Sequence, residues 1–259
     1  MQMTPFHGAD DYDKEVLTVK KVIAALVLGL AAGAVLGLQQ AMTLTPDQEA
    51  QIVAQLGSKQ ALILLAMLQT AVLAGIAALA GAWASPKVNL NKPFVISRKS
   101  MAAAAGIGLM SAALIAIAEK LIFARALGLE DRFEFSGLYF LGSLLYGGIV
   151  EELLLRYGLM TIIVWAAGKL TKSADRNGIY ITGIVIAALI FAAGHLPAAA
   201  QAFGLSAVSV TRTMLLNFLP GVGFGYLYWK HGLVYAMLGH IAAHVFNQLI
   251  LLPVLFNLM

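Results

Sequence analysis

The chain has 259 residues, of which 60% are hydrophobic and 12% are charged, and its mean hydropathy is +0.84. A soluble domain carries about 25% charged residues, so this chain lacks the polar surface that a soluble fold of its size requires. The net charge of +4 does not indicate nucleic-acid binding, because the Lys and Arg residues form short clusters between apolar runs. The absence of cysteine excludes disulfides, thiolate metal sites and a cysteine nucleophile. The composition therefore predicts an integral membrane protein.

Apolar runs along the chain predict the membrane spans. A spanning helix needs about 20 mostly apolar residues. The candidate runs lie at residues 22–42, 61–84, 101–123, 137–168, 178–196, 213–229 and 232–257. The run at 213–229 is short, and the run at 137–168 is long enough for a tilted or kinked helix. The predicted fold class is therefore all-α: a polytopic transmembrane helical bundle of about seven spans, with an intramembrane polar cavity.

Basic residues between the spans predict the orientation of the bundle. With the N-terminus in the cytoplasm, the inside loops contain Lys20, Lys21, Lys87, Lys92, Arg98, Lys99, Lys169, Lys172, Arg176 and Lys230. The outside loops contain fewer basic residues, and acidic residues accompany most of them. This bias follows the positive-inside rule, so we expect the N-terminus inside and the C-terminus outside. The sequence shows no inverted repeat of the kind found in many transporters.

The fourth predicted span contains three charged residues, Glu151, Glu152 and Arg156. A charge inside the bilayer costs roughly 2.5–3.5 kcal/mol, so such residues require a reason. Glu152 and Arg156 are four residues apart on a helix and can form an ion pair. Leu155 occupies the corresponding position after Glu151, so Glu151 has no such partner. The pattern predicts one paired and one free carboxylate, although a purely structural ion pair would have the same spacing.

Three of the five histidines lie in apolar helices. His195 is near the end of the fifth predicted span, and His240 and His244 are four residues apart, so they share a helix face. We interpret His7 and His231, in the N-terminal tail and a loop, as solvated residues. A single intramembrane histidine is more often a hydrogen-bonded packing residue, but three of them with a glutamate pair favour a functional site.

Two glutamates and three histidines are compatible with several chemistries. The sequence contains neither Gly-x-Ser-x-Gly nor His-Glu-x-x-His, and its Gly147-Gly148 pair is not followed by a phosphate-binding Lys-Ser/Thr pair. A carboxylate that takes a proton from water could hydrolyse a peptide bond, with histidines holding the water and stabilising an oxyanion. Three histidines and one glutamate could instead bind zinc and activate a metal-bound water. A proton relay in a transporter is a third reading.

The three charged or histidine-containing segments resemble the motifs of the CAAX-protease and bacteriocin-processing (CPBP) family. Its members are intramembrane glutamate endopeptidases that include the Ras-converting CAAX endopeptidase. The family motifs are Glu-Glu-x-x-x-Arg, Phe-x-x-x-His, and His followed four residues later by Asn or Asp. The matching residues here are Glu151, Glu152, Arg156, Phe191, His195, His240 and, at the Asn/Asp position, His244. The resemblance covers roughly residues 137–250.

The resemblance implies a catalytic role for five residues. Glu151 would be the general base that activates water, and His195 would orient that water. His240 and His244 would form the oxyanion site. The reverse assignment of the two glutamates, with Glu152 as the base, is the alternative.

Other residues would support the site. By the same resemblance, Arg156 would hold Glu152 in place, and Phe191 belongs to the second motif. His244 departs from the family pattern; its side chain can still donate a hydrogen bond as Asn does, and it makes a zinc site more plausible here. Asn247, one residue short of the next helical turn, is a weaker candidate for the missing Asn.

The sequence therefore predicts an intramembrane endopeptidase without a cofactor, acting on a membrane-associated peptide or protein. A zinc-dependent intramembrane metalloprotease and a non-catalytic scaffold or regulator of partner membrane proteins are the alternatives. The catalytic helical core would occupy residues 137–259, after a polar tail at 1–16 and helices without motifs at 17–136. We expect the bacterial cytoplasmic membrane as its location, with the lipid bilayer and the substrate as partners and no nucleic acid.

Overall fold

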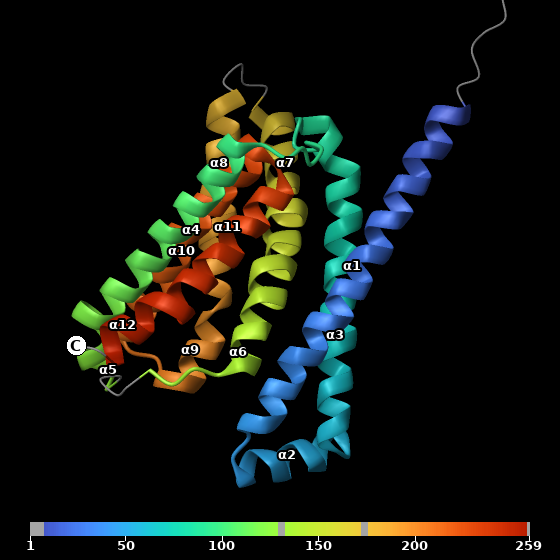
Figure 1. Ribbon diagram of the computed structural model, residues 1–259. Helices are drawn as coiled ribbons and strands as arrows, with labels where there is room; N and C mark the ends of the chain where they lie inside the picture. The colour runs from blue at the N-terminus through green and yellow to red at the C-terminus, as the bar shows by residue number, and fades with distance from the viewer. Residues whose placement is uncertain (1–7, 129–132, 172–175, 258–259) are drawn as a thin grey trace, which may run out of the picture.

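The computed structural model describes residues 8–128, 133–171 and 176–257, and these residues contain helices and loops but no β-strand. Most of the helices run between two opposite ends of a bundle (Figure 1). The predicted fold class, an all-α polytopic helical bundle, is confirmed.

The helical elements vary in length from one turn to ten turns. In chain order they are α1 (Gly8–Thr43), α2 (Pro46–Leu56), α3 (Lys59–Ala84), η1 (Ser85–Val88), α4 (Arg98–Ala118), η2 (Glu119–Phe123), α5 (Ala124–Leu127), α6 (Gly137–Gly142), η3 (Ser143–Glu151), η4 (Leu153–Met160), α7 (Thr161–Thr171), α8 (Arg176–Gly194), α9 (Leu196–Phe203), α10 (Ala207–His231), α11 (Leu233–Phe246), η5 (Asn247–Leu251) and α12 (Leu252–Asn257). Of the η elements, η1 is a 3₁₀ helix and the others are π-helical.

Six stretches of the described chain are long and apolar enough to cross a membrane. They are Val16–Thr43, Lys59–Val88, Arg98–Leu127, Gly137–Thr171, Asn177–Phe203 and Leu233–Phe256. The predicted count of seven is therefore wrong by this criterion. The predicted span 213–229 lies in α10, whose apolar character is reduced by polar residues such as Arg212 and Asn217. α10 nevertheless packs within the bundle against α8, α11 and α4 (Figure 1).

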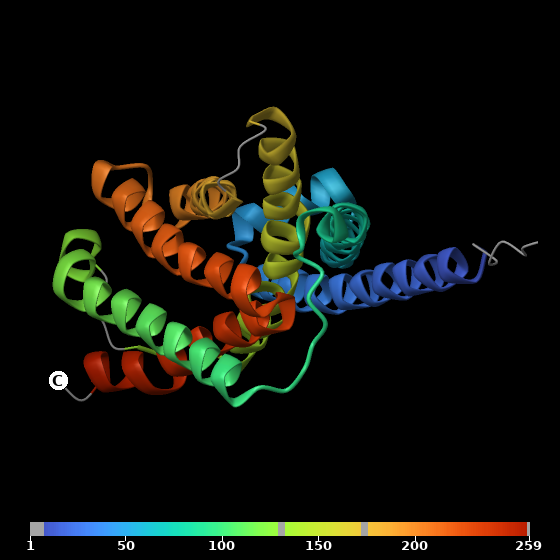
Figure 2. The same ribbon diagram turned by 90° about the horizontal axis from the view of Figure 1, so that it is seen from above.

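An N-terminal pair of helices stands beside the helices that carry the motifs. α1 packs along α3, and a Cβ added at Gly29, Gly33 or Gly37 would lie 2.6–2.8 Å from the α3 backbone. Such small residues allow two membrane helices to approach closely. α1 begins at Gly8, so the predicted tail at 1–16 is helical from that residue, and residues 1–7 lie outside the described part. Seen from above, the first half of α1 projects away from the bundle (Figure 2).

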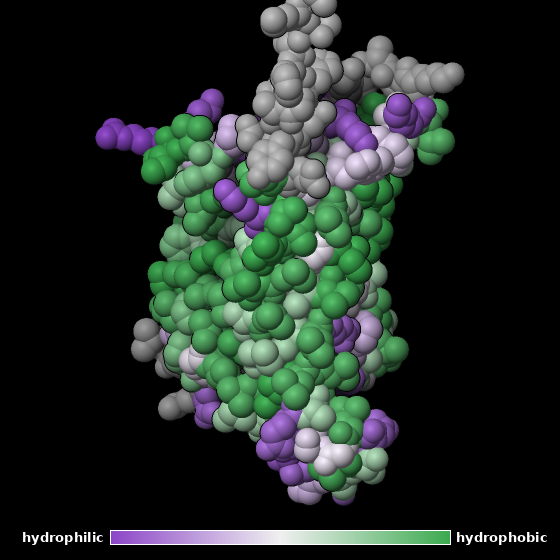
Figure 3. Space-filling view, turned by 90° about the vertical axis from the view of Figure 1, so that its right-hand side faces the viewer, coloured by the Kyte–Doolittle hydropathy of each residue, from purple (hydrophilic) through white to green (hydrophobic). Residues whose placement is uncertain are grey.

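The two ends of the bundle differ in charge. The loop between α3 and α4 and the ends of α7 and α10 lie at one end (Figure 1), which places Lys87, Lys92, Lys169 and Lys230 there. α2, with two acidic residues in its first turn, lies at the opposite end. Between the ends, the face formed by α1 and α3 is mostly hydrophobic (Figure 3). The molecule therefore has the surface of a membrane-spanning bundle.

The helix that carries the two glutamates departs from α-helical geometry. α6, η3, η4 and α7 form one helical run, Gly137–Thr171, and its central part is π-helical. Backbone hydrogen bonds in a π-helix reach five residues along the chain, and such segments occur frequently at functional sites. The apolar pattern predicted a long helix here, at 137–168, but not the π-helical geometry at its centre.

Candidate active site

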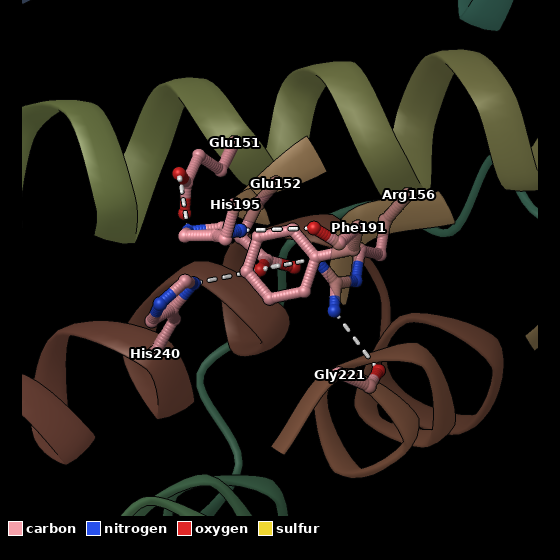
Figure 4. A network of polar contacts seen from close by, with 7 residues as sticks. All are labelled: Glu151, Glu152, Arg156, Phe191, His195, Gly221 and His240. Atoms are coloured by element: carbon pink, nitrogen blue, oxygen red, sulfur yellow. Dashed lines mark hydrogen bonds and ion pairs between the residues drawn. The ribbon is translucent and has the colours of Figure 1, made fainter. Parts of the chain in front are cut away.

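A buried network holds Glu152 in place (Figure 4). The side chain of Glu152 is 0% exposed, and its Oε1 lies 3.0 Å from Arg156 Nη1, the partner that the four-residue spacing predicted. Arg156 Nη2 donates to the carbonyl oxygen of Gly221 in α10 at 2.9 Å. His240 Nδ1, in α11, lies 2.9 Å from the same Glu152 Oε1. Glu152 therefore links its own helix to both α10 and α11.

Aromatic rings complete the environment of Arg156. Its guanidinium carbon lies 5.0 Å from the ring centre of Phe191 and 5.6 Å from that of Phe224. A desolvated guanidinium gains electrostatic attraction from such rings. Gly221 allows α10 to come this close, because a Cβ there would lie only 3.4 Å from Arg156 Nη2 and 3.3 Å from Phe191. The pair Glu152–Arg156 is thus sealed into the packing between helices.

Glu151 points away from this network towards His195 (Figure 4). The distance between Glu151 Oε1 and His195 Nε2 is 3.7 Å, and the Glu151 side chain is 13% exposed. His195 Nδ1 lies 2.9 Å from the carbonyl oxygen of Phe191, which can only accept, so Nδ1 carries the hydrogen. In the neutral ring, His195 Nε2 then carries no hydrogen, and its lone pair faces Glu151.

The position of His195 follows from a helix that continues beyond it. α8 ends at Gly194, and α9 starts at Leu196 with Pro197 in its first turn, where the missing N–H costs no helical hydrogen bond. The resulting span, Asn177–Phe203, runs on past residue 196, the predicted end. His195 therefore lies within the spanning segment rather than at its end.

His240 is fixed both by its ring nitrogen and by its ring face. Phe224 stacks on it with 4.3 Å between ring centres, and Phe191 meets it edge-on at 6.2 Å. Glu152, paired with Arg156, acts as an acceptor, so His240 Nδ1 donates the hydrogen. His240 Nε2 is consequently unprotonated in the neutral ring. It can donate to an oxyanion only when the ring is protonated.

His244 lies one turn after His240, and the two rings stack at 4.9 Å. Its Nε2 is buried and has no hydrogen-bond partner among the described residues. A Cβ added at Gly147 would lie only 2.7 Å from this nitrogen. Gly147 therefore permits the π-helical segment η3 to approach α11 at this ring. The other ring nitrogen of His244, Nδ1, lies 3.4 Å from the side-chain Nε2 of Gln248.

Two adjoining cavities meet at these side chains. The smaller one, here called the glutamate cavity, has a volume of 200 Å³ and is lined by Glu151, His195, His240 and His244. The larger one, here called the α10–α11 cavity, has a volume of 530 Å³ and also reaches His240 and His244. Phe191 lines both cavities, and neither Glu152 nor Arg156 lines either of them. Of the two glutamates, Glu151 is the one accessible to a substrate.

The predicted secondary candidate, Asn247, has a different position. It lines the α10–α11 cavity but not the glutamate cavity, and its buried Oδ1 has no hydrogen-bond partner among the described residues. The structure therefore does not bring Asn247 together with Glu151 in one cavity.

The side chains do not converge as a zinc site requires. Within the residues that the structure describes, no group of three or more His, Asp or Glu side chains is arranged to hold a metal ion. The Glu152 oxygen Oε1 is already shared by Arg156 and His240. The four-residue spacing of His240 and His244 leads to ring stacking rather than to a common ligand position.

Sequence reasoning missed several polar residues of the site. Tyr139 and Asn217 line both cavities, and Ser143 lines the glutamate cavity. Ser143 accepts a hydrogen bond from Gln248 Nε2 at 2.8 Å. The signal for Gln248 was available, because it is a polar residue within the apolar run at 232–257 and lies four positions after His244. Tyr139 and Asn217 come from other helices, and no spacing within the sequence relates them to the motifs.

Fold and site together define a class of protein: a polytopic helical membrane protein with a glutamate–histidine site enclosed by its helices. Residues 134–246 match the family model described as type II CAAX prenyl endopeptidase Rce1-like, so this segment of the chain is similar to that family. The match includes all three motifs and confirms the resemblance that they carry. This similarity indicates a peptidase. No curated protein and no solved structure matches the chain.

Proposed function

We propose that the protein is an intramembrane endopeptidase in which Glu151 activates the attacking water. The observation that supports this most directly is the 3.7 Å approach of Glu151 Oε1 to His195 Nε2 within the glutamate cavity. A water about 2.8 Å from both atoms fits beside this gap. It would donate one hydrogen to the carboxylate and one to the histidine lone pair, which leaves its own lone pair directed at a substrate carbonyl.

The reaction then balances with one acid–base group. Glu151 takes a proton from the water as the water oxygen bonds to the carbonyl carbon, and the carbonyl oxygen becomes an oxyanion. Glu151 returns the proton to the amide nitrogen as the carbon–nitrogen bond breaks, which yields a carboxylic acid and an amine. His244 faces the same cavity and would stabilise the oxyanion, and His240 would join it when its ring is protonated.

The surroundings of the site suggest the kind of substrate. The α10–α11 cavity is lined largely by apolar and aromatic residues, among them Phe133, Leu216, Phe224, Leu252 and Phe256. Such a lining binds apolar groups by removing them from water. We therefore propose that the substrate is a membrane-associated peptide or protein with apolar residues next to the bond that is cut.

The central test removes the carboxylate of Glu151 with little change in shape. Substrates can be identified by comparing membrane-protein fragments and secreted peptides of cells that express the wild-type or the Glu151→Gln protein. Cleavage is then measured in liposomes. Glu151→Gln is expected to reduce kcat by about 10²–10⁴-fold, the range for general acid–base groups. Glu49→Gln is the matched control, because Glu49 is a half-buried glutamate on α2 whose ion-pair partner is Lys59 rather than a residue of the site. Full cleavage by Glu151→Gln would refute the proposal.

Two further measurements address the alternatives. A zinc-dependent peptidase would lose activity with a chelator and would contain stoichiometric metal after purification, whereas the proposed mechanism predicts chelator-resistant cleavage. A non-catalytic scaffold would restore the phenotype of a deletion strain equally well with the Glu151→Gln protein. The proposed peptidase requires the wild-type residue.

A further inference from the structure

A buried glutamine outside the family motifs connects two elements of the site. Gln248 lies in η5, four residues after His244, and is 4% exposed. Its Nε2 lies 2.8 Å from Ser143 Oγ in η3 and 3.4 Å from His244 Nδ1, at the outer limit of hydrogen-bond distances. One amide group with two hydrogens therefore faces both a hydroxyl and an imidazole nitrogen.

The contacts of Ser143 determine which way this amide points. Ser143 Oγ lies 3.0 Å from the carbonyl oxygen of Tyr139 and 2.9 Å from that of Phe140. Both carbonyls can only accept, so the single hydroxyl hydrogen of Ser143 is directed at them. Ser143 must then accept from Gln248, and the group that Gln248 presents is its NH₂ rather than its oxygen.

The orientation of Gln248 in turn determines the tautomer of His244. Because the NH₂ of Gln248 donates to His244 Nδ1, that nitrogen is a lone pair and the ring hydrogen is on Nε2. This Nε2–H is buried and has no acceptor among the described residues. His244 lines both cavities at the point where they meet. A buried donor without a partner calls for an acceptor, and a ligand oxygen in the adjoining cavity would provide one.

The other two histidines of the site have the opposite arrangement. The hydrogens of His195 and His240 are on Nδ1, where a backbone carbonyl and Glu152 accept them. We propose that Gln248 and Ser143 are positioning residues that hold His244 in the Nε2–H tautomer, so that His244 supplies the neutral donor for the oxyanion. This inference rests on the proposed function for the identity of the acceptor, but the tautomer itself can be measured without any substrate.

The first test is the nitrogen spectrum of histidine. The protein is labelled with ¹⁵N-histidine, reconstituted in lipid and studied by solid-state NMR, with His244→Asn used to assign the His244 signals. The expected result is a protonated Nε2 and an unprotonated Nδ1 for His244. In Gln248→Glu the carboxylate accepts from the ring, and a hydrogen is expected on Nδ1. A hydrogen on Nδ1 alone in the wild-type protein would overturn the inference.

The second test separates positioning from general support of the fold. Gln248→Met keeps the size of the side chain but removes the donor. We expect kcat to fall about 10–100-fold, the range found for hydrogen bonds that orient the histidine ligands of metals, with little change in KM. Gln69→Met, on the exposed side of α3, is the control and is expected to leave kcat unchanged. Ser143→Ala removes the hydroxyl that orients the amide of Gln248, so kcat is expected to fall in this variant too.

A double variant gives the decisive comparison. An Asn at position 244 has an NH₂ donor that does not depend on a tautomer, so Gln248→Met is expected to reduce kcat less than threefold in a His244→Asn protein. An equal reduction in both backgrounds would mean that Gln248 supports only the fold, and would overturn the inference. If the wild-type protein cut no peptide, the proposed function would fail, while the NMR result would still decide the tautomer of His244.

Discussion

Glu152 and Glu151 are neighbours in the sequence but have opposite electrostatic environments. Glu152 is fully buried with Arg156, and the desolvation of two such charges is offset only by their mutual contact and by further hydrogen bonds. The carbonyl of Gly221 and the ring of His240 provide these bonds. Removing one member leaves the other charge buried without compensation. Glu151 faces a cavity, and the ion-pair partner that it has among the described residues is His195.

This difference predicts opposite outcomes for two equally conservative substitutions. Glu152→Gln is expected to reduce the free energy of unfolding by about 3–5 kcal/mol, because Arg156 loses its counter-charge in a buried place. Glu151→Gln is expected to retain the wild-type stability while losing cleavage. Denaturant unfolding in detergent, followed by circular dichroism, measures the first quantity for both variants. Equal losses of stability would show that the two carboxylates do not have these separate roles.

Only the local part of this arrangement could be derived from the sequence. The Glu152–Arg156 pair depends on residues one turn apart, so the spacing was sufficient to predict it. The contact between Glu151 and His195 depends on how two helices that are distant in the sequence pack together. Residue spacing alone does not predict this packing. The resemblance to the family motifs grouped Glu151 with His195. Gln248 was not predicted, because it lies outside those motifs.

At the scale of elements, glycines set how closely the glutamate helix approaches α11. Gly147 and Gly148 stand directly before the glutamate motif, and a Cβ on Gly147 would lie 2.7 Å from His244 Nε2. The corresponding Cβ on Gly148 would overlap the side chain of Ile241. Because neither glycine has a positive φ, their role here is close approach rather than backbone freedom.

The close approach predicts that a single methyl group at Gly147 impairs catalysis. Gly147→Ala displaces the ring of His244 from the cavity, and misplacement of a reactive group by about 1 Å can cost about 10²-fold in rate. Helix content is expected to remain unchanged, since Ala is the better helix former. The control is Gly106→Ala in α4, where an added Cβ meets no atom within 4 Å. Cleavage in liposomes at the wild-type rate by Gly147→Ala would contradict the assigned packing.

Helix geometry also limited what the sequence could predict. The apolar runs identified every helix that crosses the bundle, because the length of such a run is a local property. They did not predict the π-helical segments η3 and η4, which lie on either side of Glu152. They also ended one helix at residue 196, although α9 continues it with Pro197 in the first turn. Both features depend on packing between helices that are far apart in the sequence.

At the scale of the whole molecule, the position of α10 determines whether the two chain ends lie on the same side of the membrane. α10 is too polar for the length-and-composition criterion, yet it runs through the bundle between α8 and α11 (Figure 1). Its 25 residues span about 37 Å at 1.5 Å per residue, which exceeds the hydrocarbon thickness of a bilayer. Its polar residues Arg212 and Asn217 line the α10–α11 cavity. We therefore expect α10 to cross the membrane with its polar side facing that cavity.

The natural absence of cysteine allows a direct test of this topology. Four exposed positions are suitable for single-cysteine variants: Gln55 in α2, Lys169 at the end of α7, Leu205 before α10 and Lys230 at the end of α10. With the basic end in the cytoplasm, a membrane-impermeant maleimide should label Gln55→Cys and Leu205→Cys in intact cells. Lys169→Cys and Lys230→Cys should react only after the membrane is opened. Labelling of Leu205→Cys and Lys230→Cys from the same side would show that α10 does not cross. The reverse pattern at all four positions would retain the crossing but invert the predicted orientation.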